Sequence, residues 1–289
     1  MEMVTFEPAT ALSAGELTRL LNRAYADYAV PVWINREQFE RMCRNVSVDL
    51  ALSVVAIDNT IPVGLALLSR RGAEGWISGV GVRPAWRRRG IAQRIVQLIQ
   101  HRAQELGLER LSLEVLAQNE AALSLYNALA FTQSRTLLVL TLKKLNKMAE
   151  SSVDIGPADP YHLLSAYSRF HDVVPSWQRA LPSLQSSVAR LQGLALCEDG
   201  QLVGYLLYVC YYDVIAVLDL AVDPAHPRRT GVARLLLMTL HRSQPGLNGH
   251  VINVPSTDPL LGAFLDVGYE LEHRQYEMVW QVSADSGRL

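Results

Sequence analysis

The sequence is poor in cysteine and has no long apolar run. Its three cysteines, Cys43, Cys197 and Cys210, are odd in number and widely spaced among 289 residues, with no CxxC pair. This pattern excludes a disulfide framework and does not indicate a metal site. No stretch approaches the roughly 20 apolar residues of a membrane span, and the N-terminus MEMVTFEPAT has no apolar run behind a basic start. We therefore expect no metal, no membrane association, no signal peptide and a cytoplasmic location.

The sequence also has almost no net charge. Lys and Arg number 27 against 28 Asp and Glu, a formal net charge of −1, which argues against a partner such as nucleic acid. By contrast, 49% of the residues are hydrophobic, which is enough for sizeable cores and too many for a disordered chain. A chain of this length favours two domains of roughly 100–200 residues each.

The chain contains an internal repeat. Four segments of the first half return in the second half in the same order, at an offset of roughly 140 residues. The matched pairs are Asp58–Gly64 with Glu198–Gly204, Pro31-x-Trp33 with Pro175-x-Trp177, Val82–Ala92 with Val222–Ala233, and Leu129–Phe131 with Val267–Tyr269. Four pairs in register predict a duplicated domain.

The polar segment between the halves is the expected boundary. We predict a first domain over 1–145, a linker over 146–156 and a second domain over 157–289. Residues 1–145 carry 17 Lys and Arg against 13 Asp and Glu, whereas the remainder carries 10 against 15. The first half therefore has the more favourable electric field for an anionic ligand.

Hydrophobic periodicity predicts both strands and helices in the first half, in a mixed order and not in a regular βαβ alternation. The elements that matter most are strands over Gly75–Val82, Leu111–Leu116 and Thr136–Leu142, and helices over Gly90–Leu106 and Glu120–Leu129. The second half repeats most of this pattern. We therefore predict a mixed α/β (α+β) fold class.

A basic loop joins the strand over 75–82 to the helix over 90–106. It reads Arg87-Arg88-Arg89-Gly90-Ile91-Ala92. A helix N-terminus offers free N–H groups and the positive end of the helix dipole to an anion, and small residues allow close approach. The loop is not a P-loop or a Rossmann fingerprint, because the required Gly-Lys-Ser/Thr and third glycine are missing. Taken alone, the loop is more typical of a solvated basic turn.

Two motifs together give a more specific indication. They are Val82-x-Pro84-x-x-Arg87-x-x-Gly90-Ile91-Ala92 and Asn119-x-x-Ala122-x-x-Leu125-Tyr126-x-x-Leu129-x-Phe131. With this order and spacing, residues 4–142 resemble a GCN5-related N-acetyltransferase (GNAT) domain. The second half resembles the same family more weakly. The chain thus resembles a tandem GNAT protein, two acyl-CoA N-acyltransferase folds that each have a splayed central sheet flanked by helices. Ala130 departs from the family, which usually has Gly there.

The resemblance implies acetyl-CoA as co-substrate, bound where two parallel central strands splay apart. Main-chain groups of the first strand would contact the pantetheine arm and the thioester carbonyl, the basic loop would hold the pyrophosphate, and an asparagine would contact the arm. The residues so implied are Val80, Gly81, Val82, Arg87, Arg88, Arg89, Gly90, Ile91, Ala92 and Asn119. Asn119 is equally well suited to cap the helix that follows it.

The resemblance also implies catalytic residues. Tyr126 stands where the family places a general acid, and a phenol keeps its proton at neutral pH and can donate it to the departing thiolate. Glu114 shares a strand face with Ser112 and is the expected base, directly or through water. The alternatives are a packed aromatic for Tyr126 and a structural or solvated carboxylate for Glu114.

The acceptor and the second half are less defined by the sequence. Tyr25, Tyr28, Pro31 and Trp33 fall where the family builds its acceptor site, although they could equally seal the edge of the core. In the second half Phe264 replaces Tyr126, which indicates a degenerate domain. We expect an N-acetyltransferase acting on a small-molecule or peptide amine by direct attack in a ternary complex. The alternative is a non-catalytic acyl-CoA-binding or regulatory module.

Overall fold

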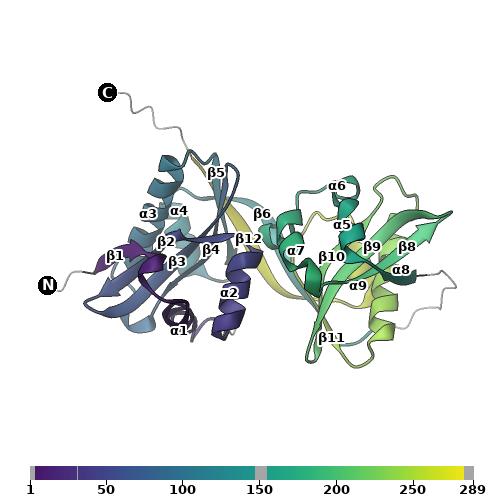
Figure 1. The fold of residues 1–289 in the computed structure, drawn as a ribbon, viewed down its shortest axis with the longest axis horizontal. Coiled ribbons are helices and arrows are strands. Elements are labelled where there is room, and N and C mark those ends of the chain that lie inside the picture. The colour runs from purple at the N-terminus through teal and green to yellow at the C-terminus, as the bar shows by residue number, and fades with distance from the viewer. Residues whose placement is uncertain (1–3, 31, 147–154, 283–289) are drawn as a thin grey trace. The chain divides into compact units, whose positions relative to one another are not determined.

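The structure is a computed structural model that describes residues 4–30, 32–146 and 155–282. It divides into two compact units (Figure 1). Unit 1 combines the chain up to Ser134 with the segment from Tyr276 onwards, and unit 2 spans Arg135–Gln275. The greater part of the predicted linker, residues 147–154, lies outside the described residues.

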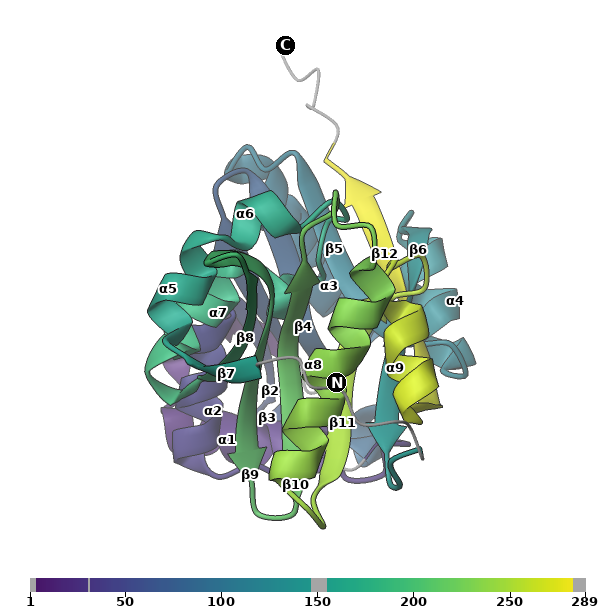
Figure 2. The same cartoon turned by 90° about the vertical axis from the view of Figure 1, so that its right-hand side faces the viewer.

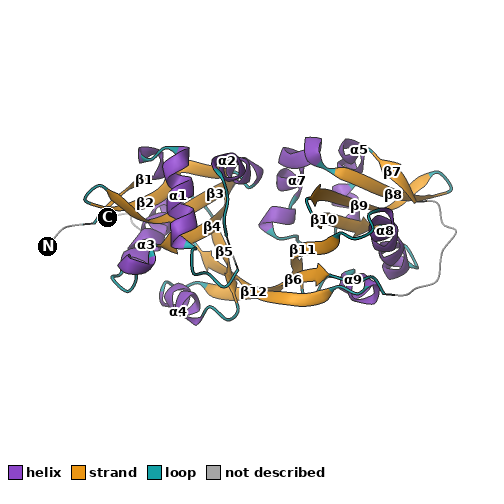
Figure 3. Cartoon of the chain, turned by 90° about the horizontal axis from the view of Figure 1, so that it is seen from below, coloured by secondary structure: helices purple, strands orange, loops and turns teal. Residues whose placement is uncertain are grey.

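Unit 1 is a sheet covered by helices on both faces (Figure 3). Its strand order is β1-β2-β3-β4-β5-β12-β6, antiparallel from β1 to β4 and parallel between β4 and β5. The elements of the first half of the sequence are β1 Thr5–Pro8, α1 Ala14–Ala24, α2 Arg36–Asn45, β2 Val48–Asp58, β3 Ile61–Arg71, β4 Glu74–Val82, α3 Ile91–Glu105, β5 Arg110–Leu116, α4 Glu120–Ala128 and β6 Thr132–Leu142, with short 3₁₀ turns at Ala9–Ala11 and Pro84–Trp86.

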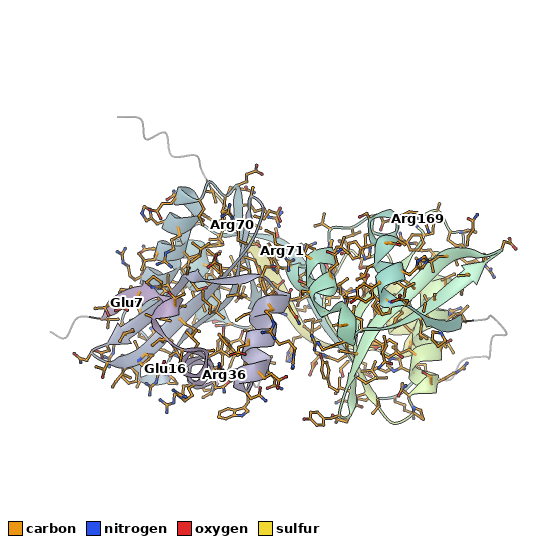
Figure 4. All side chains as sticks on the ribbon, in the orientation of Figure 1. Glu7, Glu16, Arg36, Arg70, Arg71 and Arg169 are labelled. Carbon is orange, nitrogen blue, oxygen red and sulfur yellow. The ribbon has the colours of Figure 1, made fainter. Side chains whose placement is uncertain are left out.

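Local signals in the sequence set where the helices of unit 1 begin. Ser13 and Glu16 form a capping box at the start of α1, and Glu16 is labelled in Figure 4. Asn35 and Gln38 form a second capping box at the start of α2. Such boxes satisfy N–H groups that have no partner within the helix. The apolar sides of α1 and α2 pack on one face of the sheet, and α3 covers the other.

The two parallel strands separate after a short ladder. β4 and β5 pair only from Glu74 with Arg110 to Ile77 with Leu113. At that point the register of β4 against β3 shifts, because Ser78 is an extra residue between Ile77 and Gly79. A bulge bends and twists its strand. Gly79–Val82 therefore keeps β3 on one edge, and no other strand of the described chain pairs with its second edge. This is the splay that the resemblance implies.

Unit 2 repeats this architecture. Its strand order is β6-β11-β10-β9-β8-β7, with β10 and β11 parallel. Helices α8 and α9 pack on one face, and α5, α6 and α7 on the other (Figure 2). The elements of the second half of the sequence are β7 Ile155–Ala158, α5 Pro160–Ser165, α6 Tyr167–Phe170, α7 Leu181–Ser187, β8 Gln192–Glu198, β9 Gln201–Tyr211, β10 Val214–Val222, α8 Arg229–Ser243, β11 Asn248–Pro255, α9 Leu261–Val267 and β12 Glu270–Gln281, with 3₁₀ turns at Trp177–Arg179 and Val188–Arg190.

The bulge is repeated as well. In β10 the register against β9 shifts between Val217 and Asp219, so that Leu218 is the extra residue. Leu218 corresponds to Ser78 in the repeat, and Asp219 corresponds to Gly79. A repeated irregularity at a matching position supports the duplication more strongly than the repeated order of elements does.

The last strand of each half belongs largely to the other half's unit. β6 pairs with β11 from Leu137 to Leu142 within unit 2. The end of β12 lies next to β5 within unit 1, where Met278 is 1% exposed in the core. The compact units therefore differ from the predicted halves 1–145 and 157–289 in these two segments. The boundaries 1–145 and 157–289 remain a prediction about the repeated sequence. The compact units differ from them because each last strand packs largely in the unit formed by the other half.

Candidate active site

The unpaired edge of β4 lies against the end of α1. The Tyr25 hydroxyl donates a 3.0 Å hydrogen bond to the Val80 carbonyl. A Cβ at Gly81 would stand 2.8 Å from the Ala24 Cβ and 3.0 Å from the Tyr25 ring. Such a distance forbids any side chain at Gly81. The main chain of Val80–Val82, which is expected to contact the pantetheine arm, thus lies beside the packed end of α1. The Val80 carbonyl already accepts a hydrogen bond from Tyr25.

The loop before α3 exposes backbone donors. Arg88 has a φ of 62° and Gly90 a φ of 77°, and such left-handed residues turn successive N–H groups toward one side. No acceptor within the described chain receives the N–H groups of residues 88–93. The helix dipole adds partial positive charge at the same place. The predicted anion site therefore has the free donors that it requires.

The Arg87 side chain is held by contacts within the chain, and its contact with pyrophosphate stays a prediction. Its guanidinium forms a bidentate ion pair with Asp27, at 2.7 and 2.6 Å. It also donates to the carbonyls of Val82 and Ala24, each at 3.0 Å. Hydrogen bonds from Arg87 hold the pKa of the Asp27 carboxyl below its ordinary value. The side chain therefore fastens the loop to the end of α1, and the exposed Arg88 is the loop arginine without a recorded acceptor among the described residues.

Tyr126 lies in a group of three phenols. It is 7% exposed, and its ring contacts Phe131 edge-on at 5.9 Å between centroids. Burial, and then the neighbouring Tyr25 and Tyr28, raise the pKa of Tyr126 well above its ordinary value. Its hydroxyl has no hydrogen-bond partner among the described residues. Tyr126 therefore stays protonated at neutral pH. Its O–H does not donate a hydrogen bond to another described residue.

Asn119 serves as a helix cap. Its side-chain oxygen accepts the N–H of Ala122 at 3.2 Å at the start of α4. Burial raises the pKa of the nearby Tyr28, and interaction with Asn119 offsets part of that rise. The role as N-cap, which the sequence left open, is confirmed. The contact with pantetheine stays a prediction.

Glu114 is half-buried on β5. Its neighbours Leu113 and Val115 belong to the core that packs on α3, so strand alternation turns Glu114 toward the face of α1 with Ser112. Ser112 itself is buried and donates to the Gly75 carbonyl at 3.3 Å. Glu114 therefore lies on the α1 side of the sheet, and its role as the base stays a prediction.

Of the aromatic residues expected at the acceptor, the structure brings two together. Tyr25 and Tyr28 contact edge-on with centroids 5.1 Å apart. Trp33 is 83% exposed and does not join this cluster in the part of the chain that is described. Pro31 lies outside the described residues.

Unit 2 presents a changed version of the same site. Arg229 and Asp172 form a bidentate pair with two 2.7 Å bonds. It is an ion pair of the same kind as that of Arg87 and Asp27, although the residue that matches Arg87 in the repeat is Arg228, one position earlier. Phe264, 1% exposed, replaces Tyr126. Sequence reasoning missed Asp27 as a partner of Arg87. The signal was present, because an aspartate stands two residues after the aromatic at Tyr25 and again after Phe170.

Comparison with known proteins agrees with this geometry. The model of the acetyltransferase (GNAT) family matches residues 16–131 and again 161–244. The chain therefore belongs to the GNAT family, and the tandem arrangement predicted from the sequence is confirmed.

Solved structures show the same fold over the whole chain. A GCN5-related N-acetyltransferase from Sphaerobacter thermophilus is similar with a TM-score of 0.72 and 15% identity, covering 96% of each chain. A tandem GNAT protein from the clavulanic acid biosynthesis pathway has a TM-score of 0.67 and 15% identity, covering 97% of this chain and 99% of that one.

A curated relative supports the same family. The uncharacterized N-acetyltransferase YdgE of Bacillus subtilis is 41% identical over 61 residues, which is 21% of this chain and 39% of that protein. Within the described residues, no helix is long and apolar enough to cross a membrane, and no group of His, Cys, Asp and Glu has the arrangement of a metal site.

Proposed function

We propose that unit 1 transfers the acetyl group of acetyl-CoA to a primary amine by direct attack in a ternary complex. The main support for this proposal is the hydroxyl of Tyr126, which has no hydrogen-bond partner among the described residues. Tyr126 is buried among Tyr25, Tyr28 and Phe131, beside the strand β4 where it separates from β5. The free N–H groups of residues 88–93 support it, because they suit the pyrophosphate of coenzyme A.

Each step of the proposed reaction uses residues already described. The free amine nitrogen attacks the thioester carbon. A backbone N–H on the open edge of β4 donates a hydrogen bond to the thioester oxygen and stabilises the negative charge that develops there. The C–S bond then breaks, and the thiolate takes the proton of Tyr126. The proton lost by the amine goes to Glu114, directly or through water. The products are the acetylated amine and coenzyme A, and the proton on Glu114 returns to Tyr126 through water, which restores both residues.

Unit 2 supplies no equivalent acid in this proposal. Phe264 cannot donate a proton, and Asp219 is occupied by hydrogen bonds from His171 and Tyr205. We therefore propose one productive acetyl-CoA site per chain, in unit 1.

The proposal is tested by release of free thiol from acetyl-CoA with a panel of amines, followed by mass spectrometry of the product. Active wild-type protein and a slow Tyr126→Phe variant are expected. Tyr208→Phe is the control, because it removes a hydroxyl from another buried tyrosine, in unit 2. Tight acetyl-CoA binding without turnover of any amine would favour the non-catalytic alternative.

A further inference from the structure

Two residues of β4 turn their backbone groups toward the open edge of the strand. The Arg83 N–H donates to the Val63 carbonyl at 2.8 Å, and β4 stays paired with β3 from Val82 to Gly79. Backbone groups of an antiparallel strand point alternately to its two sides, so those of Val80 and Val82 point away from β3. Along the open edge the order is Val80 N–H, Val80 carbonyl, Val82 N–H and Val82 carbonyl.

Both carbonyls on this edge are covered by side chains. The Tyr25 hydroxyl donates to the Val80 carbonyl at 3.0 Å, and the Arg87 Nε donates to the Val82 carbonyl at 3.0 Å. The N–H groups of Val80 and Val82 have no acceptor among the described residues. A free strand edge normally presents both donors and acceptors, whereas this edge presents free donors between covered acceptors.

Two glycines make room for Tyr25 at the edge. A Cβ at Gly79 would stand 3.4 Å from the Tyr25 hydroxyl, and a Cβ at Gly81 would stand 3.0 Å from its ring. In the second half Asp219 and Ala221 stand in place of these glycines. Burial raises the pKa of Tyr25 well above its ordinary value, so the hydroxyl keeps its proton and stays a donor at neutral pH.

Unit 2 has the same strand edge without the covering side chains. The Asp223 N–H donates to the Val203 carbonyl at 2.9 Å, so Leu220 and Val222 face the open edge of β10 as their counterparts do in β4. Neither of these two carbonyls receives a side-chain hydrogen bond from the residues that the structure describes.

The residues that match the two covering side chains have changed in unit 2. Phe170 stands where Tyr25 stands in the repeat, and it has no hydroxyl. Arg228 stands where Arg87 does, and its guanidinium lies 3.1 Å from a Glu198 oxygen. Within the described chain, the covered edge therefore occurs in the unit that has the proposed acid and not in the unit that lacks it.

Covering the Val80 carbonyl favours the proposed reaction. The thioester oxygen becomes negative beside this edge when the amine attacks. The oxygen of a carbonyl is the negative end of its dipole, so an uncovered Val80 carbonyl would repel that charge from its place between the two N–H groups. The Tyr25 O–H points its positive end at the same oxygen and offsets the repulsion. Groups that are fixed in place before the reaction stabilise developing charge most effectively.

We propose that Tyr25 is a positioning residue of unit 1, which covers the Val80 carbonyl and so makes the open edge of β4 electropositive toward the thioester oxygen. Arg87 has the same effect at the Val82 carbonyl. This inference rests on the function proposed for unit 1, and it assigns to Tyr25 a role that acts through the backbone of β4.

Tyr25→Phe tests the proposal, because it removes the hydroxyl and keeps the ring that packs on Gly81. Acetyl-CoA labelled with ¹³C at the thioester carbonyl is bound to the full chain without any amine, and the C=O stretch is measured by infrared difference spectroscopy. The complex of Tyr25→Phe should absorb at a higher frequency than the wild-type complex. The control Tyr276→Phe alters a tyrosine that packs in the core on the α3 face of unit 1, and its complex should absorb as the wild type does.

Steady-state assays with an amine that the wild-type protein acetylates give the second readout. Tyr25→Phe should lower kcat roughly 3- to 30-fold, which is less than the loss of about 10²–10³ on removal of a donor that touches the oxyanion directly. The Kd for acetyl-CoA, measured by calorimetry, should change less than about twofold, because the hydroxyl acts on charge that develops only in the transition state. Tyr276→Phe should keep both values.

The outcomes separate this proposal from the function on which it rests. Equal carbonyl frequencies in the wild type and Tyr25→Phe would overturn the role of Tyr25 and leave acetyl transfer by unit 1 standing. A weaker affinity for acetyl-CoA with unchanged kcat would also overturn it. Acetyl-CoA binding without turnover of any amine would refute the proposed function, while the infrared comparison would still decide the role of Tyr25. A wild-type protein that binds no acetyl-CoA would overturn both.

Discussion

The exchanged strands allow the two units to be destabilised separately, each from the opposite half of the sequence. Met278 follows all of unit 2 in the sequence, yet it is 1% exposed in the core that includes α3. Leu140 belongs to the first half, yet it is 1% exposed in the core that includes α8. Met278→Ala should therefore weaken unit 1, and Leu140→Ala should weaken unit 2.

The size of each effect follows from cavity formation. Truncation of a buried Met or Leu to Ala costs about 2–5 kcal/mol. At 1.4 kcal/mol per factor of ten, that is a rise of roughly 30- to 4000-fold in the population of the opened unit. Both variants remove a similar volume from a similarly buried position, so each is the matched control of the other.

Hydrogen exchange measured by mass spectrometry distinguishes the units. Met278→Ala should accelerate exchange in Ile91–Glu105, and Leu140→Ala should accelerate it in Arg229–Ser243. The reasoning fails if the pattern is reversed, with Met278→Ala loosening α8 and Leu140→Ala loosening α3, because each last strand would then belong to its own half.

Three further predictions concern the loop, a buried histidine and a turn. Asp27→Asn should loosen Arg87 and raise the KM for acetyl-CoA by roughly three- to tenfold, while Asp172→Asn, which alters the matching pair of unit 2, should leave that KM unchanged in steady-state assays. Burial lowers the pKa of His241 to about 4, so the unfolded state binds the proton more readily than the folded state does. In denaturant titrations the free energy of unfolding should keep its full value above pH 6.5 and fall by on the order of 3 kcal/mol toward pH 4. His241→Gln should reduce that loss. Ala130 has a φ of 62° after α4, so Ala130→Gly should stabilise the protein by about 0.5–1 kcal/mol in the same titrations, and a loss of stability would refute the argument from backbone strain.

Much of the fold was predictable because its signals are local. The alternation around Glu114 and the glycine before α3 act within a few residues, and the helix and strands that they predicted are present. The repeat was visible for the same reason, since matching turns occur in matching order. These features require no knowledge of which distant segments meet.

The strand exchange was not predictable from pattern. Thr132–Leu142 and Glu270–Gln281 are corresponding strands of two similar halves, so each presents a comparable apolar face to a comparable sheet edge. Their periodicity predicts strands but does not state which edge each one joins. The choice depends on contacts such as that of Met278 in unit 1, which form only in the folded chain.

Arg87 shows the same limit at the site. An arginine in a basic loop before a helix is typical of a phosphate ligand, and the loop by itself does not indicate the partner 60 residues away. Only the fold brings Asp27 to it. Similarly, the motif identified Tyr126, but its neighbourhood with Tyr25 and Tyr28, which raises its pKa, comes from packing of α1 against the open edge of β4.

The most direct test of the account is the turnover of Tyr126→Phe on an amine that the wild-type protein acetylates. If Tyr126 protonates the departing thiolate, kcat should fall about 10²–10⁴-fold while affinity for acetyl-CoA changes little. The control Tyr208→Phe should keep wild-type kcat. Since the pKa of Tyr126 is raised, the loss should persist at every pH at which the wild-type protein is folded. An unchanged kcat in Tyr126→Phe would contradict the proposed mechanism and leave Tyr126 as an aromatic of the core.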